Sequence, residues 1–272
     1  GFMWGARTLG VSISALISSI LIRNYGLNQT FELFGITLLA SSLFIIFQKE
    51  NITDKMISFS QLSKKEQVID LKKALYGLYQ TSVTPLIFML ILFCLVSNIS
   101  FGMHYVSISN LYTNIAGWDH EILTKIRSLG LYIGIFSAIG GGYLSDKYSP
   151  YKIIIISQLI IALTMISVFI LSGQISNLYI GSLILILLSV MGSFVMSASL
   201  SLCMGLSIKA IAATQFAFLM SIRHFSRIIG EWLAGLLDYL SISINEIYLI
   251  MFLLSFLPIL TIQRMMVLNK IR

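Results

Sequence analysis

The feature that most constrains this chain is a series of long apolar runs, almost free of charge, separated by short polar segments. Runs of this length without polar–apolar alternation are typical of helices that cross a bilayer, where every backbone N–H and C=O is paired within its own segment. The sequence therefore predicts an all-α membrane protein with about eight transmembrane helices. The runs cover approximately residues 2–22, 31–47, 84–109, 128–145, 153–172, 178–206, 210–237 and 245–263.

Composition supports the same class. Of the 272 residues, 57% are hydrophobic and only 11% are charged, whereas soluble domains contain about 45–50% apolar and about 25% charged residues. The net charge of +7 would indicate a nucleic-acid partner only if the basic residues shared a water-exposed surface. Here they lie mostly between the apolar runs, so no nucleic acid is expected. Cys94 and Cys203 lie inside apolar runs and predict buried thiols without a disulfide or metal.

The basic residues also predict an orientation. Lys and Arg are several times more frequent in segments 48–83, 146–152, 207–209 and 264–272 than in the alternate polar segments, and basic loops face the cytoplasm. Both termini of the chain are therefore expected on the cytoplasmic side. The segment 48–83 mixes charges of both signs, and it is either an amphipathic surface helix near its end or a flexible connector.

The run 210–237 contains the residues with the clearest chemistry: Gln215, Arg223, His224, Arg227 and Glu231. Arg223, Arg227 and Glu231 follow one another at intervals of four, which places them on one helix face. Arg223 falls near the middle of the run, and an arginine at that depth costs about 2.5–3.5 kcal/mol. Such a residue must face a wet cavity or a polar partner.

Two interpretations of this polar face follow. Its excess of positive charge suits an anionic solute, with His224 or Glu231 exchanging a proton near neutral pH; alternatively, Arg227 and Glu231 form a structural pair. His104, in the run 84–109, either lines the same cavity or is simply hydrogen-bonded. Arg7 either reaches the cytoplasmic interface or enters the cavity.

Small residues recur where helices could pack closely. Gly130 and Gly134 form a G-x-x-x-G pattern, and Gly230 with Ala234 forms a second pair of small residues. Such pairs predict tight helix contacts.

Enzyme signatures are not found. The sequence contains no G-x-S-x-G, H-E-x-x-H or phosphate-binding loop, and His104, His120 and His224 lie in separate segments without ligand spacing. No catalysis, metal or other cofactor is therefore predicted.

Residues 142–152 read GYLSDKYSPYK. This segment resembles the loop signature of the major facilitator superfamily, G-x-L-x-D-(R/K)-x-G-x-x-(R/K). Ser149 stands where glycine is usual, so the turn is expected to be tighter or less left-handed. The resemblance implies that Asp146 is a conformational latch, which bonds a helix N-terminus of the other half and favours one access state. The residues that match are Gly142, Asp146, Lys147 and Lys152.

The resemblance also implies a domain organisation. If this loop joins helices eight and nine of a twelve-helix transporter, the eight runs correspond to helices 5–12, and the first four helices are missing from this chain. Residues 1–48 would then be the last two helices of an N-terminal half, 49–83 the cytoplasmic linker, and 84–272 the C-terminal six-helix half. A monomer in the inner membrane of the cell is expected.

Residues 213–221, ATQFAFLMS, followed by Arg227, resemble the eleventh helix of the muropeptide permease branch, which includes acetyl-CoA transporters. This resemblance implies proton-coupled import of a bulky, anionic sugar-peptide. Residues 4–10, WGARTLG, are instead similar to the folate–biopterin transporter branch. The expected function is therefore secondary transport of an organic, muropeptide-like anion by alternating access, with protons, the solute and the bilayer as partners. The alternative is a truncated or split protein that binds or scaffolds without transporting.

Overall fold

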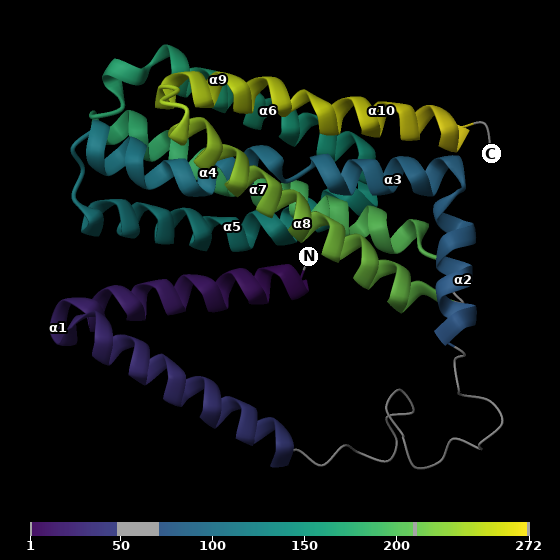
Figure 1. Cartoon of the computed structure of the whole chain (residues 1–272), viewed down its shortest axis with the longest axis horizontal. Helices are drawn as coiled ribbons and strands as arrows, with labels where there is room; N and C mark the ends of the chain where they lie inside the picture. The colour runs from purple at the N-terminus through teal and green to yellow at the C-terminus, as the bar shows by residue number, and fades with distance from the viewer. Residues whose placement is uncertain (1, 48–70, 209–210, 271–272) are drawn as a thin grey trace.

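The computed structural model describes residues 2–47, 71–208 and 211–270, and every regular element in these ranges is a helix (Figure 1). The elements are α1 (Phe2–Phe47), α2 (Leu71–Ser82), α3 (Pro85–Val96), α4 (Ile99–Ser109), the π-helical η1 (Asn110–Ile115), α5 (His120–Tyr148), α6 (Pro150–Ile170), the short 3-10 turn η2 (Ser172–Gln174), α7 (Leu178–Leu206), α8 (Ala212–Tyr239), α9 (Ile244–Leu254) and α10 (Phe256–Lys270).

Helix α1 is bent into two arms, which match the two predicted runs at 2–22 and 31–47. The bend lies at Gly26, whose φ of 80° and ψ of 173° are readily adopted only by glycine. The first arm packs along α5, whereas the second arm diverges from the bundle (Figure 1). Phe31, Leu38 and Leu39 of the second arm are exposed, as expected of side chains that face lipid.

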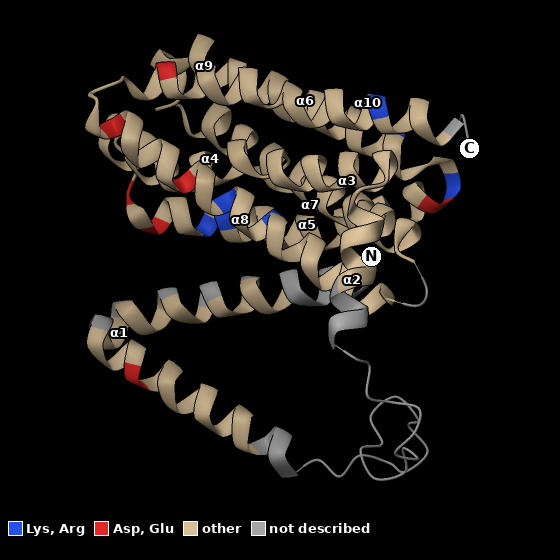
Figure 2. Cartoon of the chain, turned by 45° about the vertical axis from the view of Figure 1, so that its right-hand side comes forward, with Lys and Arg blue, Asp and Glu red and all other residues tan. Residues whose placement is uncertain are grey.

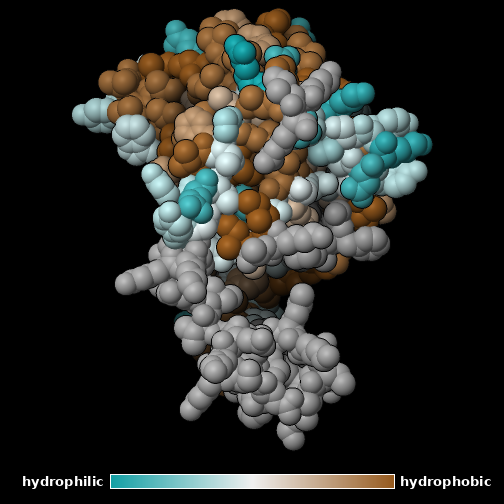
Figure 3. Space-filling model, turned by 90° about the vertical axis from the view of Figure 1, so that its right-hand side faces the viewer, coloured by the Kyte–Doolittle hydropathy of each residue, from teal (hydrophilic) through white to brown (hydrophobic). Residues whose placement is uncertain are grey.

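Helices α3 to α10 form a bundle in which successive spans run in opposite directions (Figure 1). The α5–α6 turn, the end of α7, the C-terminal end and α2 lie at one end, and the connections α5 to η1, α6 to α7 and α8 to α9 lie at the other. These are the groups that the basic-residue pattern placed on opposite sides of the membrane. Figure 3 views the first end and shows hydrophilic patches among hydrophobic side chains.

Part of the predicted linker 48–83 is helical, because α2 begins at Leu71. Residues 48–70 lie outside the described residues, as does the side chain of Arg7. The helical interpretation is therefore supported for the described part of the linker, where α2 covers Leu71–Ser82.

Five described segments are long and apolar enough to cross a membrane, so the predicted count of about eight is not confirmed. The predicted spans at 2–22, 31–47 and 210–237 are not among them. In α8 the polar face lowers the hydropathy of the segment. The five segments are Pro85–Ile115, His120–Tyr148, Pro150–Ile170, Leu178–Leu206 and Ile244–Asn269.

Two of these spans are broken near their middle, where the sequence predicted continuous runs. The first changes direction at Asn98, between α3 and α4, where φ is −114° and ψ is 3°. The second is interrupted at Ser255, between α9 and α10. Ser100 Oγ donates to Met251 O at 3.2 Å and lies 3.2 Å from Ser255 Oγ. The two breaks therefore lie side by side, at the same level of the bundle.

The breaks separate two apolar clusters. One cluster includes Met103, Tyr112 and Tyr248 and lies toward the η1 end, whereas the other includes Phe93 and Leu219 and lies toward the α2 end. Burial of apolar area stabilises each cluster. The contacts of Asn98 with Arg223 and Ser226 fall between them.

Glycines allow the closest helix contacts. A Cβ on Gly230 of α8 would overlap with the carbonyl oxygen of Ile99, and a Cβ on Gly102 of α4 would overlap with that of Arg227. In the α5–α7 contact, a Cβ on Gly130 would lie 2.8 Å from Ser189 Oγ. The predicted tight packing at both small-residue motifs is confirmed.

Gly230→Ala is expected to lower the melting temperature of the purified protein by several degrees, because the methyl group must push α4 away from α8. Overpacking of this kind costs about 1–3 kcal/mol. Gly235→Ala is the matched control on the same helix: nothing lies within 4 Å of its added Cβ, so only the gain in helix propensity remains. Equal melting temperatures for the two variants would contradict the close α4–α8 contact.

Candidate functional site

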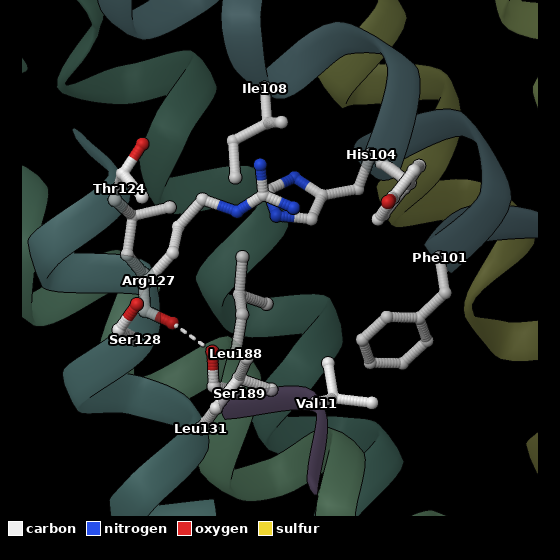
Figure 4. Close-up of a pocket in the computed structure, with 12 residues that line it drawn as sticks. Val11, Phe101, His104, Ile108, Thr124, Arg127, Ser128, Leu131, Leu188 and Ser189 are labelled. Carbon is white, nitrogen blue, oxygen red and sulfur yellow. Dashed lines mark hydrogen bonds between the residues drawn. The ribbon is translucent and has the colours of Figure 1, made fainter. Parts of the chain in front are cut away.

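A cavity of about 410 Å³ lies between α4, α5 and α7, and α1 contributes one residue to its wall (Figure 4). Volumes of this size are typical of sites for small molecules. The cavity lies at the level of the η1-side cluster, since Ile108, Leu185 and Leu188 belong both to its wall and to that cluster. The lining residues are Val11, Phe101, His104, Tyr105, Ile108, Thr124, Arg127, Ser128, Leu131, Leu185, Leu188 and Ser189.

Arg127 supplies the cation of the cavity. Its side chain extends from α5 across the cavity toward His104 of α4 (Figure 4). Ion pairs of the described residues join Lys125 to Glu121 and Arg227 to Glu231, and no described acidic side chain pairs with Arg127. Its charge therefore faces the cavity without a carboxylate partner.

His104 is held in place by a contact with Tyr248 of α9. Its Nδ1 lies 2.9 Å from the hydroxyl of Tyr248 in α9, and the two rings meet edge to face. When the tyrosine hydroxyl donates to Nδ1, the hydrogen of the neutral ring is on Nε2. No described residue bonds Nε2, which leaves that nitrogen for a ligand.

Ser128 is 2% exposed, and its Oγ has no hydrogen-bond partner in the described structure. Buried polar atoms are nearly always paired, so an unpaired hydroxyl in a cavity wall points to a missing partner. Ser189 Oγ and Thr124 Oγ1 differ, because they donate to the carbonyl oxygens of Leu185 at 2.9 Å and His120 at 2.8 Å.

Tyr105 connects the cavity to the polar face of α8. The guanidinium carbon of Arg127 lies 5.4 Å from the centre of the Tyr105 ring, and that of Arg227 lies 4.3 Å from it. Arg227 Nε also donates to Glu231 Oε1 at 2.7 Å. Figure 2 shows basic residues gathered near α8. Arg227 is therefore paired with Glu231 and also stacks on a residue of the cavity wall.

Arg223 lies at the break between α3 and α4 and does not line the cavity. It is 2% exposed, and its Nη2 lies 3.4 Å from Asn98 Oδ1. Asn98 Nδ2 donates to Arg223 O at 3.2 Å, and Asn98 N donates to Ser226 Oγ at 3.1 Å. The atoms Nε and Nη1 of Arg223 have no described partner. Arg223 thus contacts the side chain of Asn98, and Ser226 contacts its backbone, so that both residues connect α8 to the break.

The remaining predicted residues of α8 lie apart from the cavity. Gln215 is buried, and its Oε1 accepts a hydrogen bond from Ile208 N at 3.0 Å. His224 is exposed. Of the six predicted solute or proton residues, the structure brings His104, Arg227 and Glu231 to the cavity or its wall.

The predicted latch segment ends α5. Asp146 is exposed in the last turn of that helix, and Lys147 lies over the rings of Tyr143 and Tyr148, at 5.9 and 5.3 Å. The expectation of a less left-handed turn at Ser149 is wrong, because this residue has a φ of 140°. Serine is strained in this region, at a cost of about 1–3 kcal/mol. Ser149 therefore adopts a positive φ, as the glycine of the family signature can do without strain. Gly142 is buried and Lys152 is exposed.

Arg127, Tyr105 and Ser128 were missed by the sequence analysis. Arg127 was assigned to an extramembrane segment because the apolar run begins only at Ser128, whereas α5 begins at His120. A signal was available: Leu123, Gly130 and Gly134 follow helical spacing, and Arg127 shares their face. In the described parts of the chain, no three His, Cys, Asp or Glu side chains come together as metal ligands.

The chain was compared with known proteins. A family model described as Major Facilitator Superfamily matches residues 1–231, a range that contains every lining residue of the cavity. No curated protein matches the chain.

Asn98→Leu and Arg223→Met are expected to differ in stability although they break the same contact. Asn98→Leu leaves a buried charge with no described side-chain partner, which costs about 1–3 kcal/mol or more, whereas Arg223→Met removes the charge itself and is expected to be close to neutral. The melting temperature of Asn98→Leu should therefore be the lower by several degrees. Asn114→Leu, on the exposed side of η1, is the control. A larger loss for Arg223→Met would show that the guanidinium has a partner of its own.

Proposed function

This chain belongs to the Major Facilitator Superfamily, a family of membrane transporters, and from that premise we propose that it carries an organic anion by alternating access. In folds of this kind, helix bundles rock about a solute site near the middle of the membrane. Members of the family are transporters rather than enzymes. The proposal concerns the charge of the solute and the residues that bind it.

The observation that carries the proposal is the unpaired guanidinium of Arg127 inside the cavity. Arg127 is partly buried, and a cation that is partly withdrawn from water without a described counter-charge is unfavourable; a solute anion would supply the missing charge. His104 faces Arg127 across the cavity (Figure 4). These groups favour an anionic solute over a neutral or cationic one.

Proton coupling is proposed through Arg227 and Glu231. Glu231 neutralises Arg227 at 2.7 Å, and Arg227 stacks on the cavity residue Tyr105. Protonation of Glu231 would free the positive charge of Arg227 and thereby strengthen binding of an anion nearby. By reciprocity, a bound anion favours protonation of Glu231. Solute and proton would then cross together, as in a symporter.

Arg223, Gln215 and His224 enter the proposal indirectly. Arg223 and Gln215 hold the helices that carry the site, through Asn98 and Ile208, and His224 is available to exchange protons at an exposed position. A muropeptide-like solute is supported by the resemblance of residues 213–221, and a folate- or biopterin-like solute by that of residues 4–10. We propose a monomer in the inner membrane, with cytoplasmic termini.

Arg227→Leu is expected to abolish uptake into proteoliposomes while leaving membrane insertion unchanged, because the positive charge that protonation of Glu231 would release is then missing. Uptake of labelled muropeptides, folates and acyl-CoA would be measured with and without an imposed proton gradient. Arg264→Leu, an exposed change on α10, is the control. Persistent uptake by Arg227→Leu would favour a purely structural Arg227–Glu231 pair. No uptake of any solute by the unchanged chain would favour the non-transporting alternative.

Asp146→Asn is expected to slow uptake severalfold, because the proposed latch loses its negative charge. The choice of solute should not change, because Asp146 lies in the last turn of α5 and does not line the cavity. Initial rates and competition by unlabelled solutes would be measured on the same vesicles. Arg264→Gln, an exposed change on α10 outside the latch segment, is the control. Altered selectivity in Asp146→Asn would contradict the latch role.

A further inference from the structure

We infer that the cavity between α4, α5 and α7 binds a small monocarboxylate with an apolar body, held by Arg127 and Ser128. The inference rests on the proposed transport of an organic anion, and it names a solute class for this cavity that differs from the muropeptide- or folate-like solutes supported by the sequence resemblances. Two independent observations point to a ligand: Arg127 has no described acidic partner, and the buried hydroxyl of the next residue, Ser128, has no described hydrogen-bond partner.

The free polar groups of the cavity are donors. Arg127 can only donate, and Ser128 Oγ has its hydrogen uncommitted, because no described acceptor bonds it. Both residues come from adjacent positions of α5 and line the same space. A carboxylate has two oxygens that accept hydrogen bonds, and arginine matches its planar geometry. The donor set therefore suits one carboxylate.

While Glu231 is charged, the charge balance favours a single negative charge on the solute. In that state Glu231 neutralises Arg227 at 2.7 Å, so Arg127 is the cation beside the cavity that lacks an acidic partner among the described side chains. A doubly charged phosphate would bring one charge more than Arg127 compensates. Burial of an uncompensated charge is strongly unfavourable.

Apart from His104, Tyr105 and the two hydroxyl residues Thr124 and Ser189, the rest of the wall is apolar and suits an apolar body. Phe101, Ile108, Leu131 and Leu188 line the cavity (Figure 4). The hydroxyl hydrogens of Thr124 and Ser189 are bonded to backbone carbonyls. A sugar ring enclosed here would leave several of its hydroxyls without partners, which is unfavourable in a buried site.

The size of the cavity sets an upper limit on the solute. At about 410 Å³, it lies in the lower part of the range of about 300–1,000 Å³ found for small-molecule sites. An aryl- or alkyl-carboxylate fits such a volume. The carboxylate would lie between Arg127 and Ser128, and the body would lie against Phe101 and Leu188.

The test uses 3-phenylpropionate and its neutral analogue 3-phenylpropionamide as probes. Binding of each labelled probe to the purified full chain in detergent would be measured by equilibrium dialysis. The carboxylate is expected to bind, and the amide to bind at least roughly tenfold more weakly, since a hydrogen bond to a charged group is lost.

Variants of the two binding residues assign the contact. Arg127→Gln is expected to weaken carboxylate binding at least roughly tenfold, and Ser128→Ala severalfold, with Arg264→Gln and Ser221→Ala as exposed controls. Arg127→Lys keeps the charge and should restore part of the affinity. This variant keeps the test decisive if Arg127→Gln does not elute as a folded species in gel filtration.

Several outcomes would overturn the inference. The first is equal binding of the amide and the carboxylate. The second is unchanged carboxylate binding in folded Arg127→Gln and Arg127→Lys. The third is displacement of the probe by phosphatidylglycerol but not by phosphatidylcholine, which would assign the site to an anionic lipid. If the unchanged chain does not bind the probe but takes up another solute when a proton gradient is imposed, this inference alone is refuted. Specific probe binding without uptake of any solute would refute the proposed function instead.

Discussion

The structure depends on one constraint: inside hydrocarbon, each backbone group must find its hydrogen-bond partner within the protein. A continuous helix meets this condition by itself, and most of the bundle does so. The break at Asn98 does not, and side chains of α8 complete it. Ser226 accepts a hydrogen bond from the backbone of Asn98, and Arg223 bonds its side chain. The polar face of α8 is therefore explained in part by the helix beside it.

The same contact determines where the cavity lies. Gly102 and Gly230 bring α4 and α8 into backbone contact, which fixes α4 with His104 and Tyr105 on the cavity side. Tyr105 then lies between the guanidinium groups of Arg127 and Arg227. A single aromatic ring thus separates a paired cation from an unpaired one.

Much of this arrangement could be predicted from the sequence, for physical reasons. The apolar runs predicted the helices and the grouping of their connections, and the small residues predicted the closest contacts. The break at Asn98 could not be predicted, because no proline marks it and its partners are distant in sequence. The break at Ser255 could have been predicted, because Pro258 lacks the N–H that would bond the carbonyl of Leu254, and its ring crowds that carbonyl. Arg127 could not be assigned to the cavity from hydropathy, because hydropathy is averaged over a segment and the first turns of α5 are polar. Only the helical spacing within those turns places Arg127 on the inner face of α5. The division into residues 1–48, 49–83 and 84–272 stays a prediction.

The two breaks, joined through Ser100 and Ser255, divide the interior into separate cores. Side chains interdigitate within each core, whereas the level between them is crossed mainly by hydrogen bonds of serine, asparagine and arginine. Such bonds can be exchanged one at a time, while interlocked side chains must move together. Helices α6, α7 and α8 nevertheless pass this level unbroken and contribute side chains to both cores. Local freedom to bend at this level therefore belongs to the two interrupted spans, which meet at Ser100 and Ser255.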